Sequence, residues 1–245
     1  MLHRLSELDE VVRKGYDAFD FKRITRALID FMVVELSAFY FDVRKDVLYC
    51  DAPSSLRRKA ALAVVRHLFD NVVKWLAPML AFTMEEAWLA RHPEAVSVHL
   101  EQFREIPSEW RNETLAARWR KVRTVRRVVT GALEVERREK RIGSSLEAAP
   151  VVHIADADLM VAVADVDMAE ICIVSAISIV AGPAPEDAFT LDDVKGVGVV
   201  PAHASGRKCA RSWRYTDDVG SDPEFPDVSA RDAAALHELA ALGRL

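Results

Sequence analysis

The sequence predicts a mainly α-helical protein in which a helix bundle is followed by a small α+β unit and a tail of short strands and turns. Over the first 148 residues, apolar side chains recur at spacings of three and four, which is typical of helices that bury one face. After Pro150, β-branched runs of strand length replace that pattern. With 245 residues, 51% of them hydrophobic, the chain is long enough to bury a core.

Two helices are expected in the first 40 residues. An apolar stripe runs from Leu2 to Val12, and Gly15 is expected to end that helix because glycine destabilises helix interiors. Asp20 has a side chain suited to a helix N-cap. The stripe from Phe21 to Phe39 then predicts a second helix that extends as far as Tyr40.

Two further helices are expected before residue 93. The polar segment 42–55 predicts a turn, and the stripe over 56–75 predicts a third helix. Pro78 is expected to break the chain, because proline cannot occupy a regular helix interior. The Thr-x-x-Glu sequence at 83–86 predicts a capping box that starts a fourth helix, which ends at the Arg-His-Pro sequence of residues 91–93.

The segment from Asn112 to Ala148 is expected to contain a long basic helix, which Gly143 ends. Its expected apolar face consists of Leu115, Trp119, Val122, Val125, Val129 and Ala132. Residues 111–145 contain eleven Lys or Arg residues against four acidic ones, a net charge of +7 in a chain whose total is −5. This concentration of charge suits the phosphate backbone of a nucleic acid, although a solvated helix face gives the same pattern.

Three domains are expected: a helical bundle over 1–148, an α+β unit over 149–182 and a tail over 183–245. In the second, the runs VVHIA and EICIVSAISIV predict strands, separated by a short helix in DADLMVAVADVD. The tail reads as a linker followed by short strands and turns, and a final helix is expected from Ser229 to Leu242.

Catalytic and metal-binding patterns are absent from the sequence. The glycines between Lys195 and Gly198 lack the third glycine and the following helix of a phosphate-binding loop. The histidines are scattered, and the adjacent Asp217 and Asp218 have no convergent partners nearby in the sequence. The three cysteines are odd in number and far apart, which argues against a disulfide framework. With no signal peptide and no membrane span, the expected location is cytoplasmic.

Five segments together resemble the carboxy-terminal part of the bacterial isoleucyl-tRNA synthetases, and the resemblance covers almost the whole chain. They are SAFYFDVRKDVLYCD, LAPMLAFTMEEAW, SVHL at 97–100, EVERREKRIGSSLEA and KCARSWRYTDDVG. The resemblance implies an anticodon-binding helix bundle that packs against the anticodon stem and loop of tRNA(Ile). It also implies a carboxy-terminal zinc-bearing module that helps to read the anticodon.

The zinc module is altered in this sequence. The family has two Cys-x-x-Cys pairs there, and the aligned positions hold Cys209 and Ser212, then Ser229 and Asp232. Because hydroxyls are poor zinc ligands, the tail is expected to be a degenerate zinc-ribbon-like module that has lost its metal and is held by packing and the terminal helix.

Six residues are expected to bind tRNA. By resemblance to the family's tail, Lys208, Arg211 and Trp213 lie against the anticodon loop, where an indole can stack on a base and a guanidinium can pair with base edges or phosphate. A structural tryptophan with an arginine stacked on it is the alternative. On the basic helix, the candidates for phosphate contacts are Arg120, Arg123 and Arg127.

The family's catalytic signatures, a His-x-Gly-His segment and a Lys-Met-Ser-Lys-Ser loop, do not occur in these residues. The resemblance therefore implies a ligase whose use of ATP and Mg²⁺ resides in upstream catalytic and editing domains, and this chain alone is expected to be inactive. Two alternatives stay open: a non-enzymatic helical interaction module, and the equivalent part of a valine-type or methionine-type synthetase.

Overall fold

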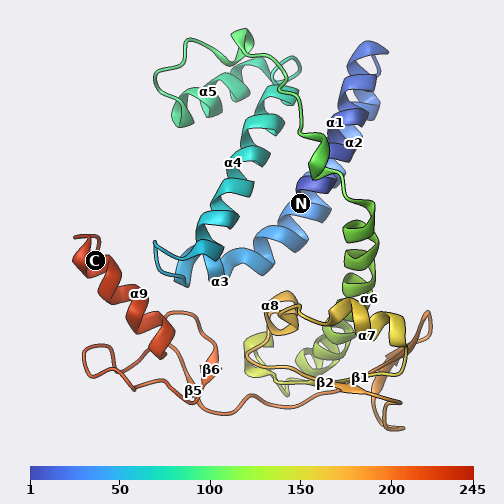
Figure 1. Ribbon diagram of the computed structural model, residues 1–245, viewed down its shortest axis with the longest axis vertical. Coiled ribbons are helices and arrows are strands. Elements are labelled where there is room, and N and C mark those ends of the chain that lie inside the picture. The colour runs from blue at the N-terminus through green and yellow to red at the C-terminus, as the bar shows by residue number, and fades with distance from the viewer. The chain divides into compact units, whose positions relative to one another are not determined.

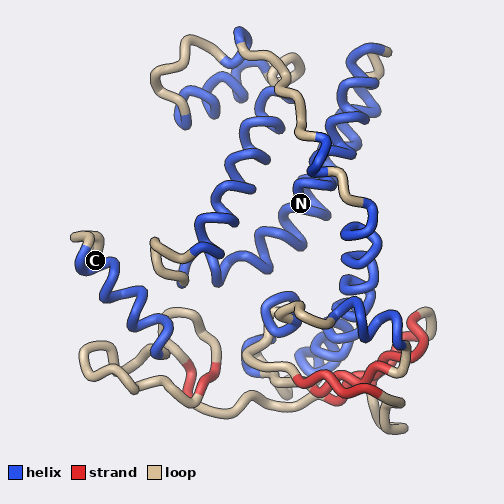
Figure 2. The backbone as a smooth tube through the Cα atoms, viewed as in Figure 1, coloured by secondary structure: helices blue, strands red, loops and turns tan.

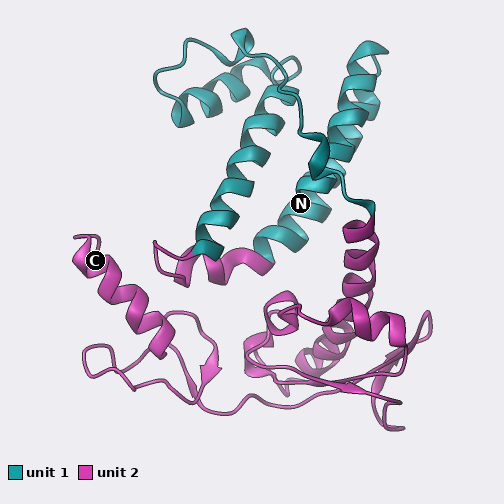
Figure 3. Ribbon diagram, viewed as in Figure 1, with its two compact units in different colours: residues 1–42, 56–113 teal, residues 43–55, 114–245 magenta.

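The computed structural model describes residues 1–245, which form two compact units. The first unit contains residues 1–42 and 56–113, and the second contains residues 43–55 and 114–245 (Figure 3). Helices predominate, and all the strands belong to the second unit (Figures 1 and 2). This agrees with the predicted mainly α class with a small sheet. No helix is both long enough and apolar enough to cross a lipid bilayer.

The first unit is a set of packed helices. They are α1 (Leu2–Asp17), α2 (Phe21–Asp30), a π-helix η1 (Phe31–Phe41), α4 (Leu56–Leu76), α5 (Ala81–Arg91) and the short 3₁₀ turns η2 (Val98–Leu100) and η3 (Ser108–Trp110). Their core contains Leu5 and Val12 of α1, Ile24 of α2, and Leu68 and Trp75 of α4, all almost fully buried. The predicted apolar stripes of these three helices therefore pack on one another.

The first helix is longer than predicted. Gly15 does not end it, since α1 continues to Asp17. A Cβ at Gly15 would lie 2.5 Å from Cγ1 of Ile24, so this glycine lets α1 and α2 pack closely. The predicted N-cap is confirmed, because the Asp20 carboxylate accepts a 3.0 Å hydrogen bond from the Arg23 amide.

The predicted turn over 42–55 is wrong for most of its length. Residues 42–50 form α3 (Asp42–Cys50), which follows η1 without a break, and only the remaining residues form a turn before α4. Val43, Val47 and Cys50 are buried at helical spacing. The charged residues between them hide this sparse apolar stripe from a reading based on composition.

The start of α5 also differs from the prediction. The chain breaks after α4 as expected at Pro78, but α5 begins at Ala81 and has no side-chain cap. Thr83 lies inside the helix, so the predicted capping box is wrong. The nearby Glu85 instead accepts hydrogen bonds from the Val98 amide and the Ser97 hydroxyl, at 2.8 and 3.1 Å. The predicted end of this helix at Arg91 is confirmed.

In the second unit, the basic segment forms α6 (Glu113–Arg138). Val122, Val125 and Val129 are buried as predicted, whereas Leu115 is 45% exposed, so the apolar face begins later than expected. The helix also ends before Gly143. Lys140 adopts a left-handed φ of 58°, and the Arg141 amide donates a 2.9 Å hydrogen bond to the Glu136 carbonyl, which closes the helix with a Schellman-type turn.

A four-stranded mixed sheet with the order β2-β1-β4-β3 lies in the same unit. Its strands are β1 (Val151–Ile154), β2 (Ser178–Ala181), β3 (Phe189–Leu191) and β4 (Val194–Val200). β1 pairs in parallel with β2 and antiparallel with β4, so the sheet joins residues 151–154 to residues 194–200.

The predicted helix between the first two strands is α7 (Ala157–Val163), and α8 (Met168–Cys172) follows it. The predicted strand from Glu170 is therefore wrong at its start and begins only at Ser178.

The last part of the second unit is a two-stranded hairpin and a helix. β5 (Arg207–Lys208) pairs antiparallel with β6 (Tyr215–Thr216), and α9 (Ala230–Ala241) begins at the N-cap Ser229, close to its predicted start. A small core that includes Cys209, Val219 and Val228 lies beneath the hairpin. The residues predicted to read RNA, 208 to 213, therefore lie on β5 and the turn that follows it.

Candidate nucleic-acid interface

Much of the positive charge of α6 is turned toward other elements of the same unit. Arg126 Nε donates a 2.8 Å hydrogen bond to the Ile171 carbonyl at α8, and Arg118 Nε donates a 2.9 Å bond to the Ala162 carbonyl of α7. Lys121 forms a 2.7 Å ion pair with Asp158. These cations attach α6 to the α7–α8 region. Some of their donors are therefore already engaged, and the Lys121–Asp158 pair also cancels one positive charge that the helix would otherwise present to a phosphate backbone.

The three predicted phosphate contacts on α6 differ in their surroundings. Arg120 is exposed, and no other side chain bonds its guanidinium. Arg127 is 54% exposed and forms a 2.6 Å ion pair with Asp193, in the turn between β3 and β4. Arg123 is partly buried. Arg120 is thus the position where a phosphate would meet no competing carboxylate.

Trp213 is presented to solvent by the turn that follows β5. Its amide donates a 2.9 Å hydrogen bond to the Cys209 carbonyl, and its φ of 63° places it in the left-handed region. The side chain is 62% exposed, and Nζ of Lys208 lies 5.8 Å from the ring centroid. An exposed indole with a cation over one face suits stacking on an unpaired base beside a phosphate. The alternative in which an arginine stacks on this ring does not describe the geometry, since the neighbouring cation is the lysine.

Arg211, which the sequence places beside Trp213, points into the protein. One guanidinium nitrogen, Nη2, donates a 2.8 Å hydrogen bond to the Tyr49 carbonyl. The other, Nη1, lies 3.0 Å from Oδ1 of Asp232 and also donates to the Cys50 carbonyl. The side chain is only 18% exposed. Its donors are therefore committed to the end of α3 and to α9.

The four positions aligned with zinc ligands come together in space. The Cys209 thiol donates a 3.0 Å hydrogen bond to Oδ2 of Asp232, and the Ser229 hydroxyl donates another of the same length. Ser212 also hydrogen-bonds the Asp232 carboxylate, whose side chain is fully buried. These contacts join the turn after β5 to the first turn of α9.

This donor set does not fit zinc. It offers one sulfur, two hydroxyls and one carboxylate, whereas structural zinc sites use thiolates and imidazoles. The carboxylate already serves as the common acceptor for the other three side chains. In the structure as a whole, no group of three or more His, Cys, Asp or Glu side chains is arranged to hold a metal ion.

Hydrogen bonds also control the charge of Asp232. Burial raises the pKa of this carboxyl, but hydrogen bonds from Cys209, Ser212 and Ser229 and the positive charge of Arg231 outweigh burial and bring the pKa below its usual value. Arg231 itself bridges Asp232 to Asp46 of α3, with an Nη2–Oδ1 distance of 3.0 Å to Asp46. The buried carboxylate therefore stays ionised and is neutralised by two arginines.

Sequence reasoning missed the part that α3 takes in this site. Asp46, Tyr49 and Cys50 all contact arginines of the tail, although more than 150 residues separate them in the chain. No local motif predicts such pairs. The charge of Asp46 is the one local signal, and the sequence predicts a turn for the segment that contains it.

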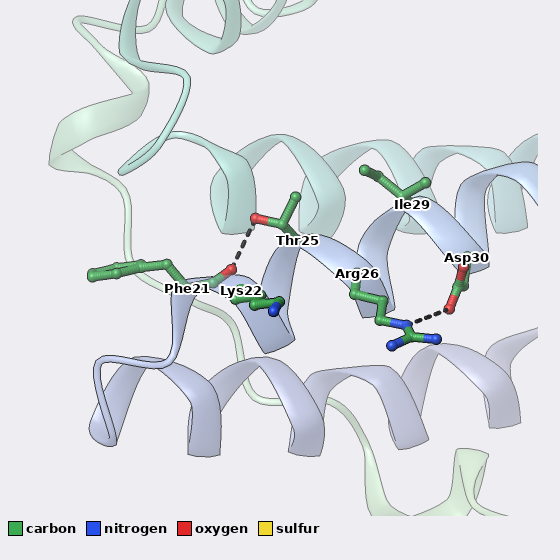
Figure 4. A pocket seen from close by; sticks show the side chains of 6 residues that line it. All are labelled: Phe21, Lys22, Thr25, Arg26, Ile29 and Asp30. Carbon is green, nitrogen blue, oxygen red and sulfur yellow. Dashed lines mark hydrogen bonds and ion pairs between the residues drawn. The ribbon is translucent and has the colours of Figure 1, made fainter.

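A shallow hollow on the first unit does not form a comparable candidate site. It has a volume of about 470 Å³ and is lined by six residues of α2 (Figure 4). The Thr25 hydroxyl is bonded to the Phe21 carbonyl at 2.8 Å, and Arg26 lies 4.0 Å from Asp30. Because these polar groups satisfy one another along one helix, the hollow carries no ligand assignment.

Residues 1–153 match the family described as the anticodon-binding domain of tRNA ligase. The chain belongs to this family. It is also similar, along its whole length, to isoleucine–tRNA ligases: 75% identical over 248 residues to that of Mesorhizobium japonicum and 72% identical over 245 residues to that of Brucella abortus. The ligase of Agrobacterium fabrum is 71% identical over 99% of the chain.

This anticodon-binding domain and its tail span about a quarter of the length of those ligases, 25% in each case. The family match ends within β1, whereas the similarity to the isoleucine–tRNA ligases continues through the tail that carries Trp213. The resemblance drawn from the five sequence segments is therefore confirmed at the level of the family.

Proposed function

We propose that this chain binds the anticodon stem and loop of tRNA(Ile), as one part of a cytoplasmic enzyme that joins isoleucine to that tRNA with ATP and Mg²⁺. The chemistry is assigned to catalytic and editing domains of that enzyme, because the 245 residues contain neither catalytic signature of the family. On its own the chain contributes binding and recognition.

The exposed indole of Trp213 carries this proposal. An aromatic ring of that size is expensive to leave in water, and the left-handed backbone at residue 213 turns it outward. Single-stranded loops are commonly read by rings of this kind, which stack on splayed bases. Lys208, over the ring, adds a positive charge where the loop's phosphates would pass.

Phosphate contacts are assigned to α6, at Arg120, Arg123 and Arg127. Contacts to the backbone position an RNA without reading its sequence, whereas base contacts carry the sequence information. The surroundings of the three arginines support unequal contributions, with Arg120 the largest because Asp193 partly neutralises Arg127.

A tRNA titration tests the proposal. Fluorescently labelled tRNA(Ile) is titrated with the chain at several salt concentrations, with tRNA(Val) and tRNA(Met) as competitors and an anticodon-swapped tRNA(Val) as the matched control. The expected result is preference for the isoleucine anticodon and an affinity that falls as salt rises. Equal affinity for all tRNAs would contradict anticodon reading, and no binding at low salt would favour the interaction-module alternative.

Replacing Trp213 with Ala should weaken binding to the cognate tRNA by about 1–3 kcal/mol while leaving the salt dependence almost unchanged. Trp213→Phe is the control, since it keeps an aromatic face. Because the ring is mostly exposed, the urea midpoint of unfolding should change little. An unchanged affinity for tRNA(Ile) in Trp213→Ala would show that the anticodon is read elsewhere.

A further inference from the structure

The guanidinium of Arg211 joins three acceptors that come from two distant parts of the chain. Two of them, the carbonyls of Tyr49 and Cys50, lie at the end of α3, and the third is the Asp232 carboxylate in the first turn of α9. Carbonyls at a helix C-terminus carry partial negative charge, which a cation stabilises. The planar fork of arginine can reach all three acceptors at once, which a lysine ammonium cannot do with the same geometry.

The backbone around Arg211 is the turn that presents Trp213. Cys209 and Ser212, on either side of Arg211, are both bonded to Asp232, and the Cys209 carbonyl accepts the hydrogen bond of the Trp213 amide. Trp213 has a positive φ, which a non-glycine residue keeps only where its surroundings hold it. The contacts of Arg211 and Asp232 supply that restraint.

We infer that Arg211 is a positioning residue, which acts on RNA binding by holding the turn that presents Trp213 rather than by touching the RNA. This inference rests on the proposed function, and it reverses the role expected for Arg211 from the sequence. Asp232 takes part in the same positioning. The ion pair between Arg211 and Asp232 holds the turn after β5 without a metal ion, and the other contacts of that turn are hydrogen bonds of neutral groups.

The committed donors of Arg211 distinguish it from its neighbours. Lys208 is exposed beside the Trp213 ring, and no carboxylate lies in contact with its ammonium. Arg211, by contrast, is mostly buried and balances the charge of a fully buried carboxylate. Moving its guanidinium to an RNA phosphate would remove a donor from two carbonyls and would leave the buried carboxylate with Arg231 as its one remaining arginine, which is costly.

A double-mutant cycle tests the inference. The probe is a hairpin RNA with the sequence of the tRNA(Ile) anticodon stem and loop, and the proteins are the chain itself, Arg211→Gln, Trp213→Ala and the double variant. Arg211→Gln should weaken binding about tenfold, within the range of one lost stacking contact. In the Trp213→Ala background the same change should alter affinity less than twofold, since the ring to be positioned is absent.

Two further variants separate positioning from a phosphate contact. Arg211→Lys keeps the charge, so it should restore affinity if Arg211 binds phosphate but should remain weak if three acceptors must be held. The slope of affinity against salt should stay unchanged in Arg211→Gln, whereas loss of a phosphate contact lowers it by about 1. Arg244→Gln, which removes an exposed tail charge, is the matched control and should bind within twofold of the unchanged chain.

A readout without RNA completes the test. The chain has five tryptophans, and fluorotryptophan labelling gives one ¹⁹F resonance for each, with that of Trp213 assigned by Trp213→Phe. Arg211→Gln should shift the Trp213 resonance and leave the other four in place. The variant Asp232→Asn keeps the shape of the Asp232 side chain but removes its charge, and it should shift the Trp213 resonance in the same way. It is the second variant to use if Arg211→Gln unfolds the tail.

The outcomes are distinguishable. Additive losses in the cycle, rescue by Arg211→Lys or an unmoved Trp213 resonance would overturn the positioning role. If the unchanged chain does not bind the hairpin at all, the proposed function fails, while the ¹⁹F measurement still decides whether Arg211 places Trp213.

Discussion

Nη2 of Arg127 lies 2.6 Å from Oδ2 of Asp193, so a basic residue of α6 is paired with a carboxylate from the turn between β3 and β4. Both side chains are more than half exposed, and such a pair contributes little to stability. Its consequence is electrostatic, because the charge of Arg127 is partly cancelled before any RNA arrives. The same helix carries Arg120 without a carboxylate partner.

The two arginines should therefore respond differently to substitution. Arg120→Gln is expected to lower the salt dependence of tRNA binding by about 1 and to weaken cognate and non-cognate tRNAs equally. Arg127→Gln should lower the slope by less than half as much. The measurement is the slope of log affinity against log salt, with urea unfolding as a check that both variants stay folded. A larger effect at Arg127 than at Arg120 would contradict this ranking.

Metal analysis should separate the hydrogen-bonded cluster around Asp232 from a zinc site. Purified from zinc-containing medium and dialysed against a chelator, the chain is expected to hold no stoichiometric zinc. The triple variant Ser212→Cys, Ser229→Cys and Asp232→Cys should hold one zinc per chain, since its four thiols converge on one point. Elemental analysis measures both.

One zinc retained by the unchanged chain would mean that other side chains, such as His203 or Asp217, complete a site with Cys209. A triple variant that binds no zinc would show that the four positions are spaced for hydrogen bonds only.

His237 should make the stability of the tail depend on pH. Its Nε2 lies 2.8 Å from Oδ2 of Asp222, and this hydrogen bond raises the pKa of His237 above 6.5 and lowers that of Asp222. A raised histidine pKa stabilises the fold fully below the unfolded value and loses its effect as the pH rises through the folded value. The difference in urea midpoint between the chain and His237→Gln should thus be clear at about pH 5.5 and vanish by about pH 8.5. A difference that grows with pH would refute this assignment.

Lys140 occupies a position that favours glycine. Its φ is 58°, and the residue closes the C-terminus of α6. Lys140→Gly should stabilise the chain by about 1 kcal/mol, because a Cβ in the left-handed region is strained. Lys140→Ala is the control and should bring no such gain, since alanine has a Cβ. Urea unfolding of the three proteins measures the difference, and a loss of stability in Lys140→Gly would show that α6 ends elsewhere.

Local patterns predicted the helices whose buried faces are rich in large apolar residues. The stripes over 21–39 and 56–75 correspond to helices in the structure, and the cap Asp20 is where the sequence suggests. Predictions failed where packing between elements overrode local preference. Gly15 stays helical because Ile24 packs against it, and α3 forms because three widely spaced apolar residues are buried.

The sequence by itself determined the mainly helical class, the concentration of positive charge in one helix and the family, since five segments and the spacing of apolar residues are local properties of the chain. Only the tertiary structure decided which cations are already paired. Whether Arg211 faces solvent or Asp232, and whether Arg127 meets Asp193, depends on residues 21 and 66 positions away. Side-chain direction and partner are set by packing and charge balance in the folded state, and neither is encoded in spacing along the chain.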